Sequence, residues 1–261
     1  MAVSIKSARE IELMRESGRI LAMVHEELGK AIRPGITTLE IDILAERLIR
    51  SYDCIPNFLH YNGFPASVCV SINEEVIHGI PNKKRVLKDG DIVSLDAGLI
   101  YKGYHSDAAR THLVGEVAPE VQKLVEETRN CFFAGIKMAK AGNHLFDISN
   151  AIDEYISQFG YGIVREFVGH GIGTRLHEDP EIPNFTQARR GVKLQPGMTL
   201  AIEPMINLGR ADIEILDDNW TVVAADGLPS AHYENTVLIT EGEPEILSLL
   251  KKLLMRQTPP L

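Results

Sequence analysis

Apolar positions along the chain recur first with a helical period and then with a strand period. The helical part predicts a first helix that is capped by Ser7, with Glu10 completing a capping box, and that runs toward Pro34-Gly35. A second helix is predicted over about residues 38–52. The apolar positions are Ile11, Met14, Leu21, Val24 and Leu28 in the first helix and Leu39, Ile43, Leu44 and Leu48 in the second.

Short apolar runs bounded by turn residues follow these helices and predict strands. Their sequences are SVCVSI, EEVIHGI, DIVSLDAGLI and YHSDAARTHL. The same order then starts again: Pro119 opens a helix that ends at Gly142, and another covers residues 145–159 before Gly160. LDDNW is expected to form the turn of an additional hairpin, and residues 257–261 to fray. The later strands carry, in order, His170, Glu203 and Glu234.

The two halves of the chain also repeat each other in detail. Leu87 leads into Asp96 with the spacing by which Leu194 leads into Glu203, at an offset of 107 residues. HGIP at 78–81 has an echo in HEDP at 177–180. Such a repeat of two long units indicates a duplicated half-domain. We therefore expect a single domain over residues 1–261, built from halves of about 1–115 and 116–240 that meet near a pseudo-two-fold axis.

Four acidic residues fall in segments with the pattern of buried strands. Asp96 and Asp107 lie in the first half, and Glu203 and Glu234 in the second. Acidic side chains are depleted in strands and are rarely buried without a partner. Like charges facing each other on neighbouring strands repel. The pattern therefore indicates bound positive charge, most simply a pair of divalent cations.

The first pair has a predictable geometry. A hairpin turn centred on Tyr101-Lys102 places Asp96 directly opposite Asp107. Taken alone, the pair is equally compatible with one carboxylate at a sheet end and one in a loop, and the repeat in the second half favours the metal site. Alternation along the strand puts Ile92, Ser94, Asp96 and Gly98 on one face and Val93, Leu95, Ala97 and Leu99 on the other.

Three histidines extend this candidate site. His170 is flanked by glycines in EFVGHGIGTRLHE, a pattern that also occurs in ordinary loops. Beside four carboxylates, it is better interpreted as a fifth ligand, because such a donor set suits two divalent ions. His78 and His177 begin the repeated H-x-x-P motifs and would flank the metals from opposite halves; the alternative is that both only cap loop backbone groups.

Composition and charge narrow the class of protein. The chain has 261 residues, 44% of them hydrophobic, and a net charge of −9, which fit an enzyme-sized globular protein and argue against a nucleic-acid binder. No apolar run is long enough to span a bilayer, and the first residues do not resemble a secretory leader. Cys54, Cys69 and Cys131 are widely spaced, so we expect buried thiols in the reducing cytoplasm.

The order and context of these residues resemble type I methionine aminopeptidases. The motifs are HGIP, GHGIG, LHEDP, AIEP and HYENT, and the resemblance covers about residues 5–240. It implies the α+β pita-bread fold, with an antiparallel sheet backed by helices. It also implies two divalent metals (Co, Mn, Fe or Zn), bridged by Asp107 and Glu234, with Asp96 on the first and His170 and Glu203 on the second.

The resemblance further implies roles in catalysis and substrate binding. Glu203 would shuttle the proton, His177 would stabilise the oxyanion, and His78 would contact the scissile nitrogen. The substrates would be peptides and nascent proteins with an amino-terminal methionine. We expect the protein to be a monomer that encounters nascent chains at the ribosome. Phe58 and Leu176 stand where a cysteine and a phenylalanine are frequent in bacterial members. Pocket residues carried over are Phe58, Tyr61, Phe64, Cys69, Leu176 and Trp220, each of which could instead be ordinary core.

Two alternatives share these features. Xaa-Pro aminopeptidases and prolidases have the same fold and the same five ligands, but they carry an additional amino-terminal domain, for which this sequence leaves no room. A non-catalytic pita-bread module that recruits partners would be expected to lose ligands, whereas all five are present in this chain.

Overall fold

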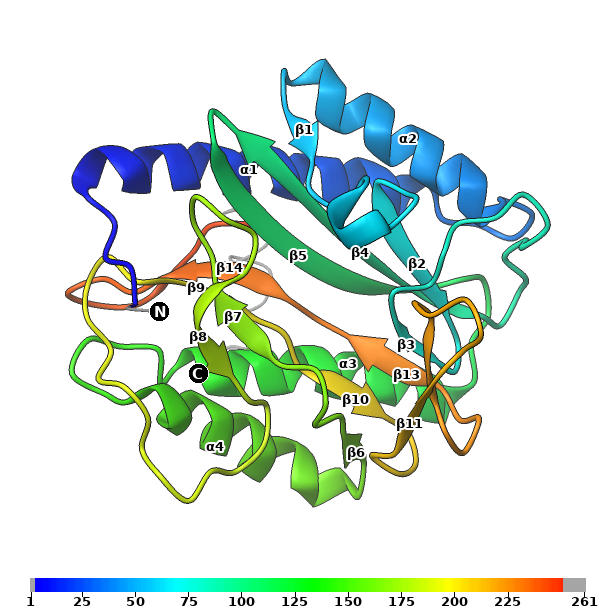
Figure 1. Cartoon of the computed structure of the whole chain (residues 1–261). Coiled ribbons are helices and arrows are strands. Elements are labelled where there is room, and N and C mark those ends of the chain that lie inside the picture. The colour runs from blue at the N-terminus through cyan, green and yellow to red at the C-terminus, as the bar shows by residue number, and fades with distance from the viewer. Residues whose placement is uncertain (1–2, 251–261) are drawn as a thin grey trace.

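The computed structural model describes residues 3–250, in which helices flank antiparallel sheets (Figure 1). The helices are α1 (Ala8–Ala31), α2 (Thr38–Ser51), α3 (Pro119–Ile136) and α4 (Leu145–Ile156), with 3-10 turns η1 (Tyr61–Gly63) and η2 (Ser157–Phe159). The strands of the first half are β1 (Ile55–Pro56), β2 (Val68–Ile72), β3 (Glu75–Ile77), β4 (Ile92–Tyr101) and β5 (Tyr104–Leu113). Those of the second half are β6 (Gly162–Ile163), β7 (Gly169–Gly171), β8 (Glu178–Ile182), β9 (Thr199–Ile202), β10 (Met205–Asn207), β11 (Ile213–Ile215), β12 (Val222–Ala224), β13 (Ser230–His232), β14 (Asn235–Leu238) and β15 (Glu245–Ile246).

The first helix has the predicted start. Ser7 caps α1, and its side chain and that of Glu10 form both bonds of the capping box. α3 begins at Pro119 as expected but ends at Ile136, earlier than Gly142. The last predicted turn of α4 is the 3-10 turn η2, which Gly160 closes in the left-handed conformation.

The predicted apolar face of α2 is only partly right. Leu44 and Leu48 are half-buried and pack against the core, but Ile43 is 57% exposed. The helix buries Thr38, Ile41, Ala45 and Ile49, and from residue 41 onward these positions form one helical stripe with Leu44 and Leu48, from which Ile43 is offset. The Asp42 carboxylate accepts hydrogen bonds from the backbone N–H groups of residues 67 and 68 at the start of β2, which turns the Ile41 side of the helix toward the sheet.

The hairpin of β4 and β5 turns one residue later than predicted. Tyr101 pairs with Tyr104, so Lys102 and Gly103 occupy the turn, both with positive φ. A type I′ turn requires this conformation at both central positions, and glycine accepts it without strain. Asp107 therefore lies opposite Gly98, and Asp96 opposite Ala109. The two carboxylates remain on one face of the sheet, but as diagonal neighbours.

The strands form four sheets within residues 3–250. One sheet has the order β1-β4-β2, and β5 also pairs with β4. The largest sheet has the order β15-β14-β9-β7-β8. The others have the orders β13-β10-β6 and β11-β12-β3; the hairpin of β11 and β12 carries the LDDNW turn, as predicted. Glu203 and Glu234 do not lie within strands, contrary to expectation. Glu203 follows β9 directly and precedes Pro204, which lacks the N–H that a continued ladder needs.

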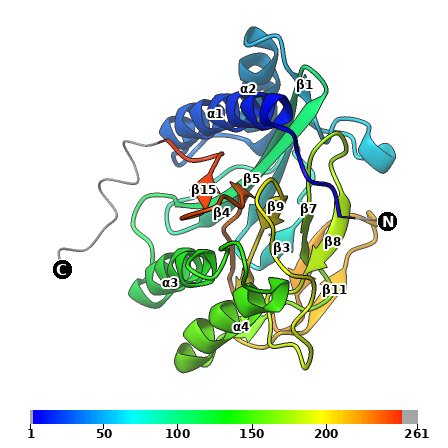
Figure 2. The same ribbon diagram turned by 90° about the vertical axis from the view of Figure 1, so that its left-hand side faces the viewer.

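The structural elements repeat at the offset seen in the sequence. Thr37 bridges to Val86, and His144 bridges to Lys193, each partner lying 107 residues after its counterpart. Each half has its own apolar core, one beneath α1 and α2 and the other beneath α3 and α4. Figure 2 shows these helix pairs on opposite sides of the strands. The halves join where the backbone of Glu234 pairs with Ala109 of β5.

Three further observations bear on the predictions made from the sequence. Between residues 3 and 250, no helix is both long and apolar enough to cross a membrane. The predicted frayed end, residues 257–261, lies outside the described residues. Cys54, Cys69 and Cys131 are buried free thiols, as predicted.

Candidate active site

A cavity of about 300 Å³ opens between the two halves. It brings together residues from β4, β5, β7 and the connections around β9, β12 and β14, which lie far apart in the sequence. Every site residue predicted from the sequence lines it: Phe58, Tyr61, Phe64, Cys69, His78, Asp96, Asp107, His170, Leu176, His177, Glu203, Trp220 and Glu234.

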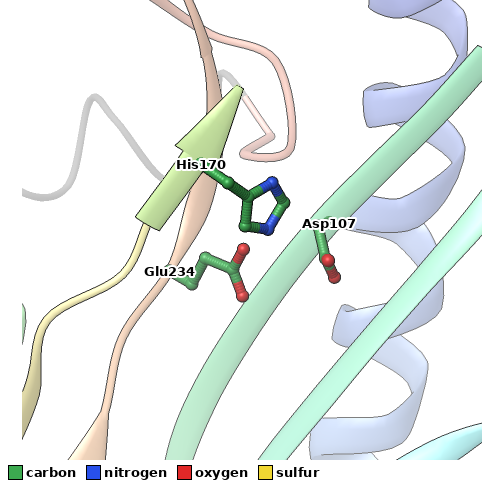
Figure 3. A group of neighbouring side chains, drawn as sticks. All are labelled: Asp107, His170 and Glu234. Carbon is green, nitrogen blue, oxygen red and sulfur yellow. The ribbon is translucent and has the colours of Figure 1, made fainter. Parts of the chain in front are cut away.

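Three of the predicted metal ligands form a tight group at the base of the cavity. Ligand atoms of Asp107, His170 and Glu234 all lie within 4.8 Å of one another, and all three residues are buried. Figure 3 shows the side chains pointing toward one another from β5, β7 and the segment before β14. Glu203 extends the group, with Oε1 3.6 Å from Nε2 of His170. Asp96 adjoins Asp107, and each carboxyl group affects the pKa of the other.

Burial makes negative charge costly in this group. Desolvation raises the pKa of Asp96 to about 7. Desolvation, followed by repulsion from neighbouring carboxylates, holds the pKa values of Asp107, Glu203 and Glu234 well above the usual range. Oδ1 of Asp96 and Oε1 of Glu234 are buried and have no hydrogen-bond partner among residues 3–250. Four crowded carboxyl groups with unused acceptors are what divalent cations would stabilise in the charged form.

His170 has the orientation of a metal ligand. Its Nδ1 lies 2.8 Å from the carbonyl oxygen of Gly171, which can only accept, so Nδ1 carries the proton and Nε2 presents its lone pair to the carboxylates. Burial lowers its pKa to about 3, which keeps the imidazole neutral. A Cβ at Gly169 or Gly171 would meet the backbone of Ala201 or Asp179, so glycines are required where β7 lies close to its neighbours. The donor set therefore fits divalent metal.

The other two histidines stand at the wall of the cavity. Nδ1 of His177 lies 2.8 Å from the Tyr61 hydroxyl, and its ring centroid is 4.3 Å from that of His170. His78 has a φ of 59° and packs edge-on against Phe167. Burial lowers the pKa of His78 to about 4, and burial also lowers that of His177. Both imidazoles are thus neutral near pH 7 and can exchange hydrogen bonds with a substrate.

The opposite wall is apolar. The ring centroids of Phe64 and Trp220 lie 5.1 Å apart at 72°, and Phe58, Cys69 and Leu176 belong to the same cluster of buried residues. These side chains are therefore both core and pocket lining, so the two interpretations open at the sequence level do not exclude each other.

Several neighbours of the site were not found from the sequence. His232 is buried, and its Nε2 lies 3.9 Å from Oε2 of Glu203. Thr236 exchanges hydrogen bonds with the backbone of Asp107 across the junction of the halves. Both residues lie within two positions of Glu234 in the HYENT motif, and this proximity in sequence could have indicated them. The cavity lining also includes Asn62, Ile77, Phe167 and Val168.

Comparisons with known proteins agree with this geometry. The model of metallopeptidase family M24 matches residues 12–241. A methionine aminopeptidase of Clostridium acetobutylicum is 53% identical, over 95% of this chain and 99% of the relative. The crystal structure of methionine aminopeptidase from Thermotoga maritima superposes with a TM-score of 0.93 at 43% identity, covering 95% of this chain and all of that one.

A more distant likeness separates the alternatives. The Xaa-Pro dipeptidase of Bacillus anthracis has a TM-score of 0.71 at 25% identity, and this chain covers 61% of it. The methionine aminopeptidases match along nearly their full length, so they are the better fit, and their likeness confirms the pita-bread fold. The chain belongs to metallopeptidase family M24, among its bacterial methionine aminopeptidases.

Proposed function

We propose that this protein is a methionine aminopeptidase that removes the amino-terminal methionine from peptides whose second residue is small. The observation that carries the proposal is the convergence of five metal-ligating side chains in one cavity whose opposite wall is apolar. The named relatives support the same activity.

We propose that the five side chains hold two divalent ions, of Co, Mn, Fe or Zn. Asp96 would serve one ion, His170 and Glu203 the other, and Asp107 and Glu234 both. Asp107 and Glu234 come from different halves and their ligand atoms lie within 4.8 Å of each other, which supports their shared role. When bound here, such ions lower the pKa of water and polarise a carbonyl oxygen.

The neighbouring side chains would then move protons and hold the substrate. Glu203 would take the proton of the attacking water and return it to the leaving amine. The Tyr61 hydroxyl can donate to Nδ1 of His177, which leaves its Nε2–H free to donate to the scissile carbonyl oxygen. His78 faces the cavity from the other half and would contact the scissile nitrogen.

Selection of methionine would come from the apolar wall. A flexible thioether fits an irregular pocket and makes favourable contacts with aromatic rings, here those of Phe58, Phe64 and Trp220. Action on nascent chains at the ribosome, in the cytoplasm and as a monomer, is also part of the proposal and rests on the resemblance to the family.

A metal assay on a single variant tests the proposal. Asp107→Asn keeps the size of a central ligand and removes its charge. We expect it to bind fewer ions than wild type by elemental analysis and to lose nearly all release of methionine from Met-Ala-Ser. Wild-type metal content and turnover in this variant would rule out the proposed centre. A chelated wild-type protein that regains activity with added Mn supports it, whereas a non-catalytic module would stay inactive.

A further inference from the structure

The loop that carries His177 is fastened to the start of the chain by a buried ion pair. Nζ of Lys6 lies 2.7 Å from Oε2 of Glu178, and the two side chains are only 3% and 6% exposed. Lys6 lies in the segment before α1, and Glu178 is the first residue of β8 and directly follows His177. In Figure 1 the dark-blue segment before α1 runs from that helix toward β7 and β8.

The other oxygen of Glu178 organises the loop itself. Oε1 accepts hydrogen bonds from the hydroxyl of Thr174, at 3.3 Å, and from the backbone N–H of Arg175, at 3.2 Å. A Cβ on Gly173 would lie 2.5 Å from Cε of Lys6, so the lysine stem packs directly on the loop. One carboxylate thus joins loop backbone to Lys6 immediately beside His177.

Lys6 is itself held in place. Its backbone N–H donates to the carbonyl of Gly197, at 2.8 Å, in the turn that leads into β9. β9 ends directly before Glu203, so Lys6 connects the loop of His177 to the segment that presents Glu203. His177 then has two restraints. The Tyr61 hydroxyl holds its ring, and the Lys6–Glu178 pair holds the next residue of the chain.

A buried ion pair contributes little to stability, because desolvation of both charges offsets their attraction, and apolar residues of equal size would serve as well. Its directional contacts do fix geometry. Resting on the proposed function, we propose that Lys6 is a positioning residue: through Glu178 it holds the His177 imidazole where it meets the scissile carbonyl. The proposal assigns no contact between Lys6 and the substrate.

The test compares wild type with Lys6→Met, Glu178→Gln and the double variant, each loaded with Mn and assayed on Met-Ala-Ser. We expect each to lower kcat by about 10- to 100-fold, as small misplacements of catalytic groups do. KM and metal content should stay near wild type. The kcat of the double variant should not fall below that of the slower single variant, because all three variants break the same ion pair. The double variant also removes both buried charges, so it remains testable if a single variant folds poorly.

Arg15→Met is the control. It breaks the Arg15–Glu245 pair, which also ties the beginning of the chain to a distant segment but is more exposed, at 40% and 35%, and lines a different hollow from that of His177. This control should keep wild-type kcat even if its melting temperature falls. If the Lys6 variants lose thermal stability in the same way and keep kcat, the pair is only structural and the proposal is overturned.

A second readout separates this proposal from the proposed function. In protein labelled with 15N-histidine, the His177 signals are identified by their loss in His177→Ala. We expect Lys6→Met to shift or broaden these signals. If wild type releases no methionine, the proposed function fails, and the His177 signals decide the positioning role: unchanged signals in Lys6→Met overturn it.

Discussion

A single imidazole illustrates how the site works at the scale of the residue. Among residues 3–250, His177 forms no ion pair with a carboxylate of the metal group, and its Nδ1 lies 2.8 Å from the Tyr61 hydroxyl. We therefore expect His177→Ala to keep the metal content of wild type while kcat falls about 10²- to 10³-fold, the loss that follows removal of one oxyanion donor. Elemental analysis and steady-state kinetics measure both. A variant that loses metal would show that His177 is a ligand and that the roles of His170 and His177 are exchanged.

The sequence predicted the members of this site better than their supporting contacts. Carboxylates and histidines announce themselves, because they are rare in buried strands and carry recognisable chemistry. Thr236 has no such signal of its own, and His232, although a histidine in the HYENT motif, was not singled out. Their places beside Asp107 and Glu203 depend on contacts between the two halves, which local patterns do not contain.

At the scale of elements, α1 packs closely on the segment after β15. A Cβ on Gly18 would lie 2.6 Å from the carbonyl carbon of Leu247. Gly→Ala inside a helix normally raises stability by about 1 kcal/mol. Here we expect the opposite sign, a loss of about 1–3 kcal/mol in the free energy of unfolding, because rigid backbone blocks the added methyl group.

Denaturant unfolding of Gly18→Ala measures this effect. Gly242→Ala is the matched control, since a Cβ there meets nothing within 4 Å. That variant should stay within about 0.5 kcal/mol of wild type. Equal stability of Gly18→Ala and wild type would mean that α1 and Leu247 are not packed as described.

The ends of helices, their buried faces and the pairing of strands show how far local sequence patterns predict the elements. Capping residues placed the start of α1, since the cap is local chemistry. The period of α2 was sufficient to find Leu44 and Leu48, but Ile43 was wrongly assigned to that stripe in place of Ile41, whose side of the helix the hydrogen bonds of Asp42 hold toward the sheet. The turn between β4 and β5 was predicted one residue too early, which shifted the pairing by two residues, although Gly103 carried the information: it fits the second position of a type I′ turn.

For the whole molecule, the buried carboxylates predict how the metal-free protein responds to pH. Folding raises the pKa values of these carboxyl groups, to about 7 for Asp96. The folded protein therefore binds more protons than the unfolded chain, and the free energy of unfolding falls as pH rises through the folded-state pKa values. The buried histidines, whose pKa values are lowered, are neutral in the folded protein above about pH 6.5. An unfolded histidine is still half protonated at about pH 6.5 and about nine-tenths neutral only near pH 7.5. Between about pH 7.5 and 8.5 we therefore expect the raised carboxyl pKa values to dominate and the melting temperature of chelated protein to fall.

Thermal unfolding across this range provides the check. The slope is about 1.4 kcal/mol per pH unit for each proton by which the states differ. Asp107→Asn should show a shallower fall, and Mn-loaded wild type a flatter curve, because the metal replaces the protons. A chelated wild-type protein whose melting temperature is constant or rises over this range would contradict the buried, crowded state of the four carboxyl groups.

The repeat of elements could be found from the sequence because part of it keeps one spacing: the Thr37–Val86 and His144–Lys193 bridges recur at the 107-residue offset first seen in the leucines. The way the halves close over one cavity could not be found, since it depends on the pairing of Glu234 with Ala109 across the junction. That closure is what combines the metal-ligating face with the apolar wall.

The central claim, removal of methionine at this cavity, is tested most directly by one competition assay. The Mn-loaded enzyme receives Met-Ala-Ser, Met-Lys-Ser, Ala-Ala-Ser and Ala-Pro-Ser together, and the released amino acids are quantified. Met-Ala-Ser should be cut first. Ala-Ala-Ser should be about 10- to 150-fold slower, because alanine forgoes the burial of a methionine side chain, worth about 1.5–3 kcal/mol. Met-Lys-Ser should also be poor, since the second residue lies deep between the halves. Faster cleavage of Ala-Pro-Ser than of Met-Ala-Ser would contradict the account and assign the cavity to prolidase-like chemistry.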